Sequence, residues 1–84
     1  SHDFYKKIGN DLMDMNTHFQ MGLYYYKLNQ PQASADNFNS ALNFARNLNL
    51  TERQAVILYN LGFLYANSGN AQMAIDYFNQ ALPL

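Results

Sequence analysis

The segment Leu58-Tyr59-Asn60-Leu61-Gly62-Phe63-Leu64-Tyr65 decides the fold of this chain, because an earlier stretch repeats it. That earlier stretch is Met21-Gly22-Leu23-Tyr24-Tyr25. The two glycines stand 40 residues apart, and each is followed at the same distance by a phenylalanine, Phe38 or Phe78, and then by an Ala-Leu pair. Self-similarity at this spacing is typical of helical units stacked one on another.

The repeated residue types predict close packing of helices rather than a chemical site. A glycine on the first helix of a unit lets the second helix approach, and the small residues Ala74 and Ala81 on the second helix are expected to fit against it. Tyr65 and Phe78 are expected to fill the space that remains between the units.

Turn chemistry interrupts the chain at residues 29–32, 47–52 and 67–70. Between these interruptions apolar residues recur at helical spacing, which predicts helices over about 3–28, 32–48, 52–67 and 71–82. The first helix has an alternative, a break near Gly9-Asn10, and Asp3 and Thr51 are candidate N-caps. Because the connections are short, neighbouring helices should be antiparallel. The predicted fold is all-α, with about four helices forming antiparallel pairs that stack as a short α-solenoid.

On these residues the chain resembles the tetratricopeptide repeat (TPR) family. The second copy matches the family pattern almost throughout, whereas the first copy has His18 in place of a large apolar residue and Ser34 in place of alanine. The 40-residue spacing is longer than the usual 34 and resembles the long-repeat variants of the family, with the extra residues at 43–48. The resemblance implies one domain, 1–84, divided into a helical extension at 1–14 and repeats at 15–50 and 51–84.

Composition excludes several classes of function. The net charge is −1, only 13% of residues are charged, and the five lysines and arginines are scattered, so no basic face is available for nucleic acid. Apolar runs are too short for a membrane helix, and there is no cysteine for a disulfide or a thiolate metal site. We expect a soluble cytoplasmic protein without cofactors that interacts with neither nucleic acid nor membrane. Because the chain begins at Ser1-His2 instead of methionine, we expect an added or cut end there.

No arrangement of residues predicts catalysis or a metal site. The two histidines are His2 and His18, and no zinc-binding or phosphate-binding motif is present. Asp11 and Asp14 share a helical face, with His18 four residues beyond, but a solvated face explains this pattern better than a ligand set. We therefore predict that the chain is not an enzyme.

The family resemblance implies where a partner would bind. In TPR proteins the first helix of each pair lines a concave groove, and this chain places aromatic and amide side chains at the corresponding positions. Such a surface suits a peptide or helix docked by apolar side chains, with amides bonding its backbone. The implied lining residues are Asn16, Phe19, Gln20, Leu23, Tyr26, Lys27, Val56, Tyr59, Asn60, Phe63, Ala66 and Asn67.

Asn60 matches the family position whose amide commonly holds the main chain of a ligand. The alternative is an asparagine that faces water or bonds within its own helix, and the sequence leaves both interpretations open. Phe19 and Leu23 occupy positions where carboxylate-clamp members of the family need Lys and Asn, which argues against capture of a C-terminal carboxylate.

Two repeats are few for a solenoid, which normally needs about three and polar end caps. The last helix has no cap after it, and we expect an apolar patch of Tyr77, Phe78, Leu82 and Leu84. This patch predicts a homo-oligomer, unless the chain is part of a longer protein. A monomer that tolerates the patch is the alternative.

The leading functional hypothesis is a protein-interaction module that binds a peptide or helix of a partner protein. The alternatives are a self-assembling structural adaptor and the peptide-sensing fragment of a larger bacterial regulator.

Overall fold

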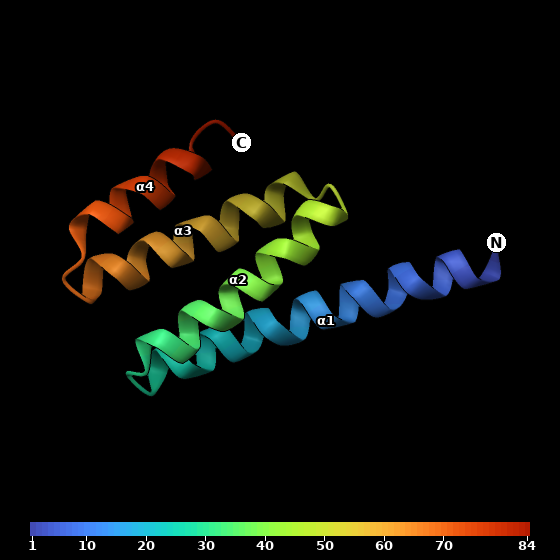
Figure 1. Cartoon of the computed structure of the whole chain (residues 1–84), viewed down its shortest axis with the longest axis horizontal. Coiled ribbons are helices and arrows are strands. Elements are labelled where there is room, and N and C mark those ends of the chain that lie inside the picture. The colour runs from blue at the N-terminus through green and yellow to red at the C-terminus, as the bar shows by residue number, and fades with distance from the viewer.

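A computed structural model describes all residues, 1–84, and shows four helices joined by short turns (Figure 1). They are α1 (His2–Lys27), α2 (Pro31–Asn47), α3 (Thr51–Asn67) and α4 (Ala71–Ala81). Each helix packs mainly on its neighbours in the chain, so α1 and α4 lie at opposite edges of the molecule. The prediction of an all-α, stacked-pair fold is confirmed.

All three turns have the same backbone construction. One residue in each turn has positive φ, namely Asn29 (57°), Asn49 (56°) or Gly69 (83°). The amide of the following residue donates to a carbonyl five residues back, as in Gln30 N to Tyr25 O at 3.0 Å and Asn70 N to Tyr65 O at 2.9 Å. Asparagine and glycine tolerate this left-handed conformation better than other residues, which explains why they occupy these positions.

The helix starts differ from two of the predicted caps. The Ser1 hydroxyl accepts from the Phe4 amide at 3.3 Å and caps α1, so Asp3 lies within the first turn. Thr51 is the first residue of α3, whose N-cap position belongs to Leu50 and has no side-chain bond. Both predictions of an N-cap were wrong, because each helix begins one or two residues earlier than its polar side chain suggests.

Helix α1 is continuous through Gly9, so the alternative of a break near Gly9-Asn10 does not hold. Glycine weakens a helix, but the Lys7 ammonium lies 2.8 Å from the Asp11 carboxylate and links the turns on either side of Gly9. The N-terminal half of α1 projects beyond the rest of the molecule (Figure 1).

The glycines of the repeat accommodate phenylalanine rings. A Cβ atom at Gly22 would lie 2.5 Å from Cδ1 of Phe38, and one at Gly62 would lie 2.6 Å from Cδ1 of Phe78. Ala74 and Ala81 are both buried, as expected of small residues packed between helices, and the group nearest to each glycine is the phenylalanine ring.

Ser34, which departs from the family pattern, makes a specific bond in the core. Its hydroxyl donates to the Gly22 carbonyl at 2.7 Å, from a fully buried position. The bond links α1 to α2, and no buried side-chain nitrogen or oxygen atom lacks a hydrogen-bond partner.

Helix α2 has 17 residues and continues to Asn47. Its last turns bury Ala45 and place Phe44 beside the ring of His18, with 6.0 Å between ring centroids. They extend the surface that α2 shares with α1 and support the start of α3.

Candidate protein-binding face

The residues predicted to line a groove lie on two helices, α1 and α3, that belong to different repeats. On α1 the side chains of Phe19 and Leu23 are half-buried, and the other predicted residues are exposed. On α3 Asn60 is half-buried, and Val56, Tyr59, Ala66 and Asn67 are among the exposed residues. Their spacing of three, four and seven residues places each set along one side of its helix.

Two side-chain contacts bring these sets together. The Arg53 guanidinium of α3 lies over the Phe19 ring of α1, 5.5 Å from its centroid. Near the other end of the two helices, the Asn67 amide donates to the Tyr26 hydroxyl. The predicted residues of α1 and α3 therefore form a shared surface, which we call the α1–α3 face.

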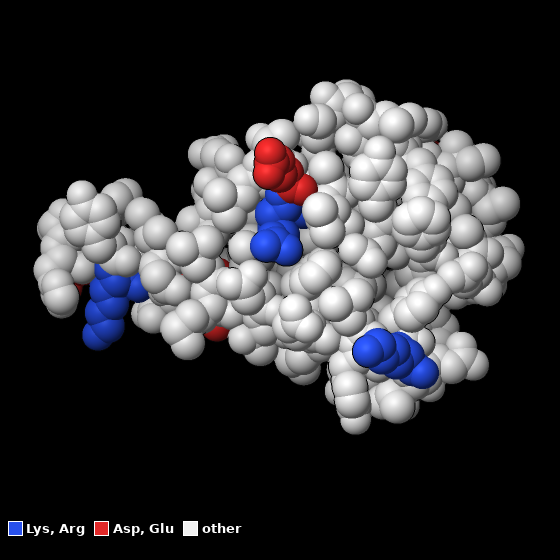
Figure 2. All heavy atoms as spheres, turned by 180° about the vertical axis from the view of Figure 1, so that it is seen from behind, with Lys and Arg blue, Asp and Glu red and all other residues white.

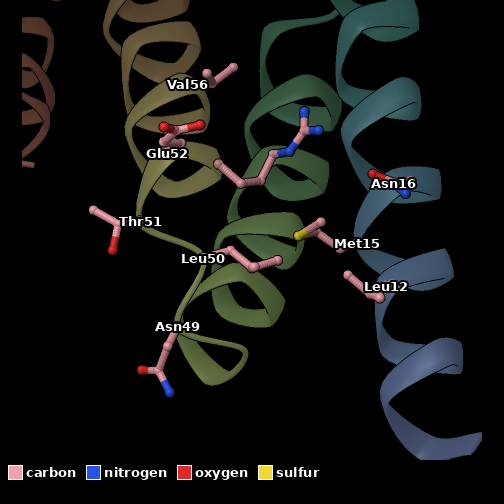
Figure 3. A pocket seen from close by; sticks show the side chains of 9 residues that line it. Leu12, Met15, Asn16, Asn49, Leu50, Thr51, Glu52 and Val56 are labelled. Atoms are coloured by element: carbon pink, nitrogen blue, oxygen red, sulfur yellow. The ribbon is translucent and has the colours of Figure 1, made fainter. Parts of the chain in front are cut away.

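An open hollow of about 600 Å³ lies at one end of the α1–α3 face. Leu12, Met15 and Asn16 approach it from α1, and Leu50 and Val56 approach it from the start of α3 (Figure 3). A smaller hollow of about 160 Å³ includes Tyr26 and Asn67 at the opposite end. Both hollows have mixed apolar and polar walls, as ligand-binding sites commonly do.

Sequence reasoning missed Leu12, Leu50 and Arg53 as parts of this face. Arg53 stands three residues before Val56 on the same side of α3, so helical spacing contained a signal for it. Leu50 belongs to a turn, where no periodicity applies.

Aromatic rings gather on the outer part of the second repeat. Phe78 is half-buried against Gly62, and the rings of Tyr59 and Phe63 lie 6.1 and 5.2 Å from it, centroid to centroid. Tyr77 stacks on Tyr65 with centroids 5.5 Å apart. Of the four residues predicted for self-association, Tyr77 and Phe78 thus pack partly within the repeat, and Leu82 and Leu84 are exposed.

Comparison with known proteins identifies the family. The model of the tetratricopeptide repeat family matches residues 13–84. The chain belongs to the tetratricopeptide repeat family. It is 36% identical over 64 residues to the photosystem I assembly protein Ycf3 of Acaryochloris marina (strain MBIC 11017), a match that covers 71% of this chain and 39% of that protein. No solved structure matches the chain.

TPR membership points to a protein-interaction module rather than an enzyme. The chain spans about two fifths of the length of the relative it matches. None of the helices in this TPR chain has the length and apolar character needed to cross a lipid bilayer.

At the TPR position represented by Asn60, the side-chain amide donates to the Val56 carbonyl of its own helix at 2.9 Å. This is one of the two interpretations that the sequence leaves open, and it describes the chain without a partner. The Val56 carbonyl lies four residues back, where it also accepts from the helix backbone. The Asn60 amide can therefore leave the Val56 carbonyl, which keeps its backbone hydrogen bond.

Charge is sparse on this TPR domain. Figure 2 shows few charged side chains on one face, an acidic group beside a basic group near the centre and the rest separated by broad uncharged surface. The one ion pair joins Lys7 and Asp11, and Nδ1 of His18 lies 2.8 Å from the backbone oxygen of Asp14. No three His, Cys, Asp or Glu side chains cluster as metal ligands would. Apolar and hydrogen-bonding groups thus dominate what a partner would contact.

We expect the Tyr65 phenol to make the stability of the TPR domain sensitive to alkaline pH. Burial raises its pKa above the usual value of 10.0, and Tyr77 and Asp36 raise the pKa further. Because the folded state disfavours the ionised phenol, the stabilising contribution is complete below pH 10 and is lost as pH rises through the raised pKa. We expect Tyr65→Phe to lose a late-ionising component in a spectrophotometric titration and to resist alkaline unfolding better than wild type. Tyr5→Phe, at an exposed site, is the control and should keep the late-ionising component. A late-ionising component that persists in Tyr65→Phe would contradict this assignment.

Proposed function

We propose that this TPR module binds an extended peptide or a helix of a partner protein along the α1–α3 face. The observation that carries the proposal is the outer side of α3, where Val56, Tyr59 and Phe63 are exposed on successive turns beside the carboxamide of Asn60. Large apolar side chains that remain exposed together commonly mark a binding surface.

Each part of the face has a role in recognising such a partner. Apolar side chains of the partner would occupy the hollow beside Leu12 and Val56 and the space between the exposed rings. The Asn60 amide would exchange its bond with the Val56 carbonyl for one with the partner main chain, since a carboxamide both donates and accepts. Arg53 and Asn67, which already bridge the two helices, would hold their spacing.

The similarity to Ycf3 supports a role in the assembly of proteins. That relative is named a photosystem I assembly protein, and the matched part of it corresponds to most of this chain. We propose that the chain holds a protein subunit during the assembly of a larger complex. No reaction is required of it, because holding and releasing a partner needs only the surface described above.

The test uses a random peptide library displayed on phage and selected against the chain. The affinity of the selected peptide is then measured by calorimetry for wild type, Phe63→Ala and Asn60→Ala. We expect Phe63→Ala to weaken binding about tenfold or more, because buried aromatic anchors carry much of the energy of such interfaces. Asn60→Ala should weaken it less, by loss of one or two hydrogen bonds to the peptide backbone.

Tyr5→Ala is the matched control, because Tyr5 is an exposed aromatic residue on the projecting part of α1. Its affinity for the selected peptide should equal that of wild type. NMR amide shifts induced by the peptide should concentrate on α1 and α3. Unchanged affinity in both Phe63→Ala and Asn60→Ala would exclude this face as the binding site.

A further inference from the structure

The two repeats can be compared position by position, 40 residues apart, and their outer surfaces differ in a systematic way. In the first repeat Ala35, Phe38 and Leu42 of α2 are buried in the core to which α3 contributes. In the second repeat no helix covers the corresponding residues, which are Ile75 and Phe78 of α4 and Leu82 directly after it. Ile75 is 51% exposed, Leu82 is 68% exposed, and Phe78 is only partly buried. We call Ile75, Phe78 and Leu82 the tail surface.

Helix α1 exposes the positions at which α3, its counterpart in the second repeat, is buried. In α3 the residues Ile57, Leu61 and Leu64 are buried in the same core cluster as α2. The residues 40 positions earlier in α1 are Thr17, Met21 and Tyr24, and all three are exposed, Met21 by 39% and Tyr24 by 59%. We call Thr17, Met21 and Tyr24 the head surface.

We propose that the head surface of one copy of this chain docks on the tail surface of a second copy, as α3 docks on α2 within each copy. One molecule carries both surfaces, at the repeat positions that α3 and α2 use for their contact inside the molecule. In this proposal the occupant of the tail surface is α1 of a second copy.

Charge does not oppose this association. Helix α4 carries a single charged residue, Asp76, and residues 17–26 of α1 contain no Asp, Glu, Lys or Arg. Docking would bury apolar side chains while removing almost no charge from water, which is the favourable case for a protein interface.

The contact joins two different surfaces, so it does not close on itself. A head-to-tail interface leaves one free head and one free tail after each addition, and it generates chains of variable length instead of a fixed dimer. The mean mass should therefore rise continuously with concentration.

The experiment measures absolute mass by light scattering after size exclusion, over a hundredfold concentration range, for wild type, Leu82→Lys and Tyr24→Lys. Both positions are exposed in the single copy, so circular dichroism should show that the variants fold. We expect wild type to increase in mass with concentration and each variant alone to stay monomeric. An equimolar mixture of the two variants should form a dimer and nothing larger, because one variant retains a head and the other a tail.

Ile75→Lys replaces Leu82→Lys if the latter does not fold, and Tyr5→Lys, on the projecting part of α1, should associate as wild type does. Three results would overturn the proposal: a wild-type monomer at all concentrations, a Tyr24→Lys variant that still assembles, or a mixture that stays monomeric. None of these results depends on peptide binding at Asn60 and Phe63, so this proposal and the proposed function can fail separately.

Discussion

Phe38→Ala is expected to lower the free energy of unfolding by about 3–5 kcal/mol, the largest effect of any single substitution considered for this chain. The Phe38 side chain is only 1% exposed, and its ring fills the space above Gly22 against Phe19, with 5.7 Å between ring centroids. Removing it leaves a cavity that the surrounding helices cannot fully close. Because small domains are stable by about 5–15 kcal/mol in total, much of the protein should be unfolded at moderate urea concentrations.

Phe78→Ala provides the matched comparison, because Phe78 occupies the same position in the second repeat. Its ring also lies over a glycine but remains partly exposed, so its removal should cost clearly less free energy than removal of Phe38. Urea titrations followed by circular dichroism measure both values. Equal losses would show that the two rings are buried to the same extent in solution, contrary to the structure of the single copy.

Gly62→Leu is expected to destabilise the fold by about 1–3 kcal/mol through overpacking. Any Cβ atom at Gly62 would overlap the Phe78 ring, so the ring must shift from its place against α3. For a domain of this size, each kcal/mol of lost stability lowers the melting temperature by about 4–8 °C.

Gly9→Leu is the control for Gly62→Leu, since both replace a glycine inside a helix and only their surroundings differ. A Cβ atom at Gly9 would meet nothing within 4 Å, and leucine favours the helix over glycine by roughly 0.5–1 kcal/mol. Gly9→Leu should therefore raise the melting temperature. Adding Phe78→Ala to Gly62→Leu should also cost less than the two separate losses combined, because the small side chain makes room for the leucine. A Gly62→Leu variant that melts with wild type would contradict the contact between Gly62 and Phe78.

The sequence was sufficient to predict the helices, because turn residues and helical periodicity are local properties. The structure begins and ends the helices within about one residue of the predicted positions. What the sequence could not predict was which side chain meets which across helices. The sequence shows the interval from Gly62 to Phe78, but only the coordinates show that the Phe78 ring lies nearest to the glycine.

The candidate site was less accessible to sequence reasoning, because it depends on the relative position of α1 and α3. Spacing grouped the residues on each helix, and the family resemblance indicated that the two groups share a face. The bridge from Arg53 to Phe19 and the intrahelical bond of Asn60 depend on side-chain conformation, which no pattern specifies. The sequence pattern did not single out Ile75, because its exposure depends on how the helices are arranged around α4.

The stacking order of the helices also determines how the molecule can bend. Since α1 and α4 lie at opposite edges, no direct bond between them fixes the angle between the two repeats. That angle depends mainly on the packing of α2 on α3 and on side-chain contacts between the repeats, from Arg53 to Phe19, from Asn67 to Tyr26 and from Arg46 to Gln80. A small rotation at this junction changes the curvature of the whole chain and displaces the outer helices, α1 and α4, relative to each other. A partner that spans α1 and α3 would therefore restrain the rotation between the two repeats, and the bound module would be stiffer than the free one.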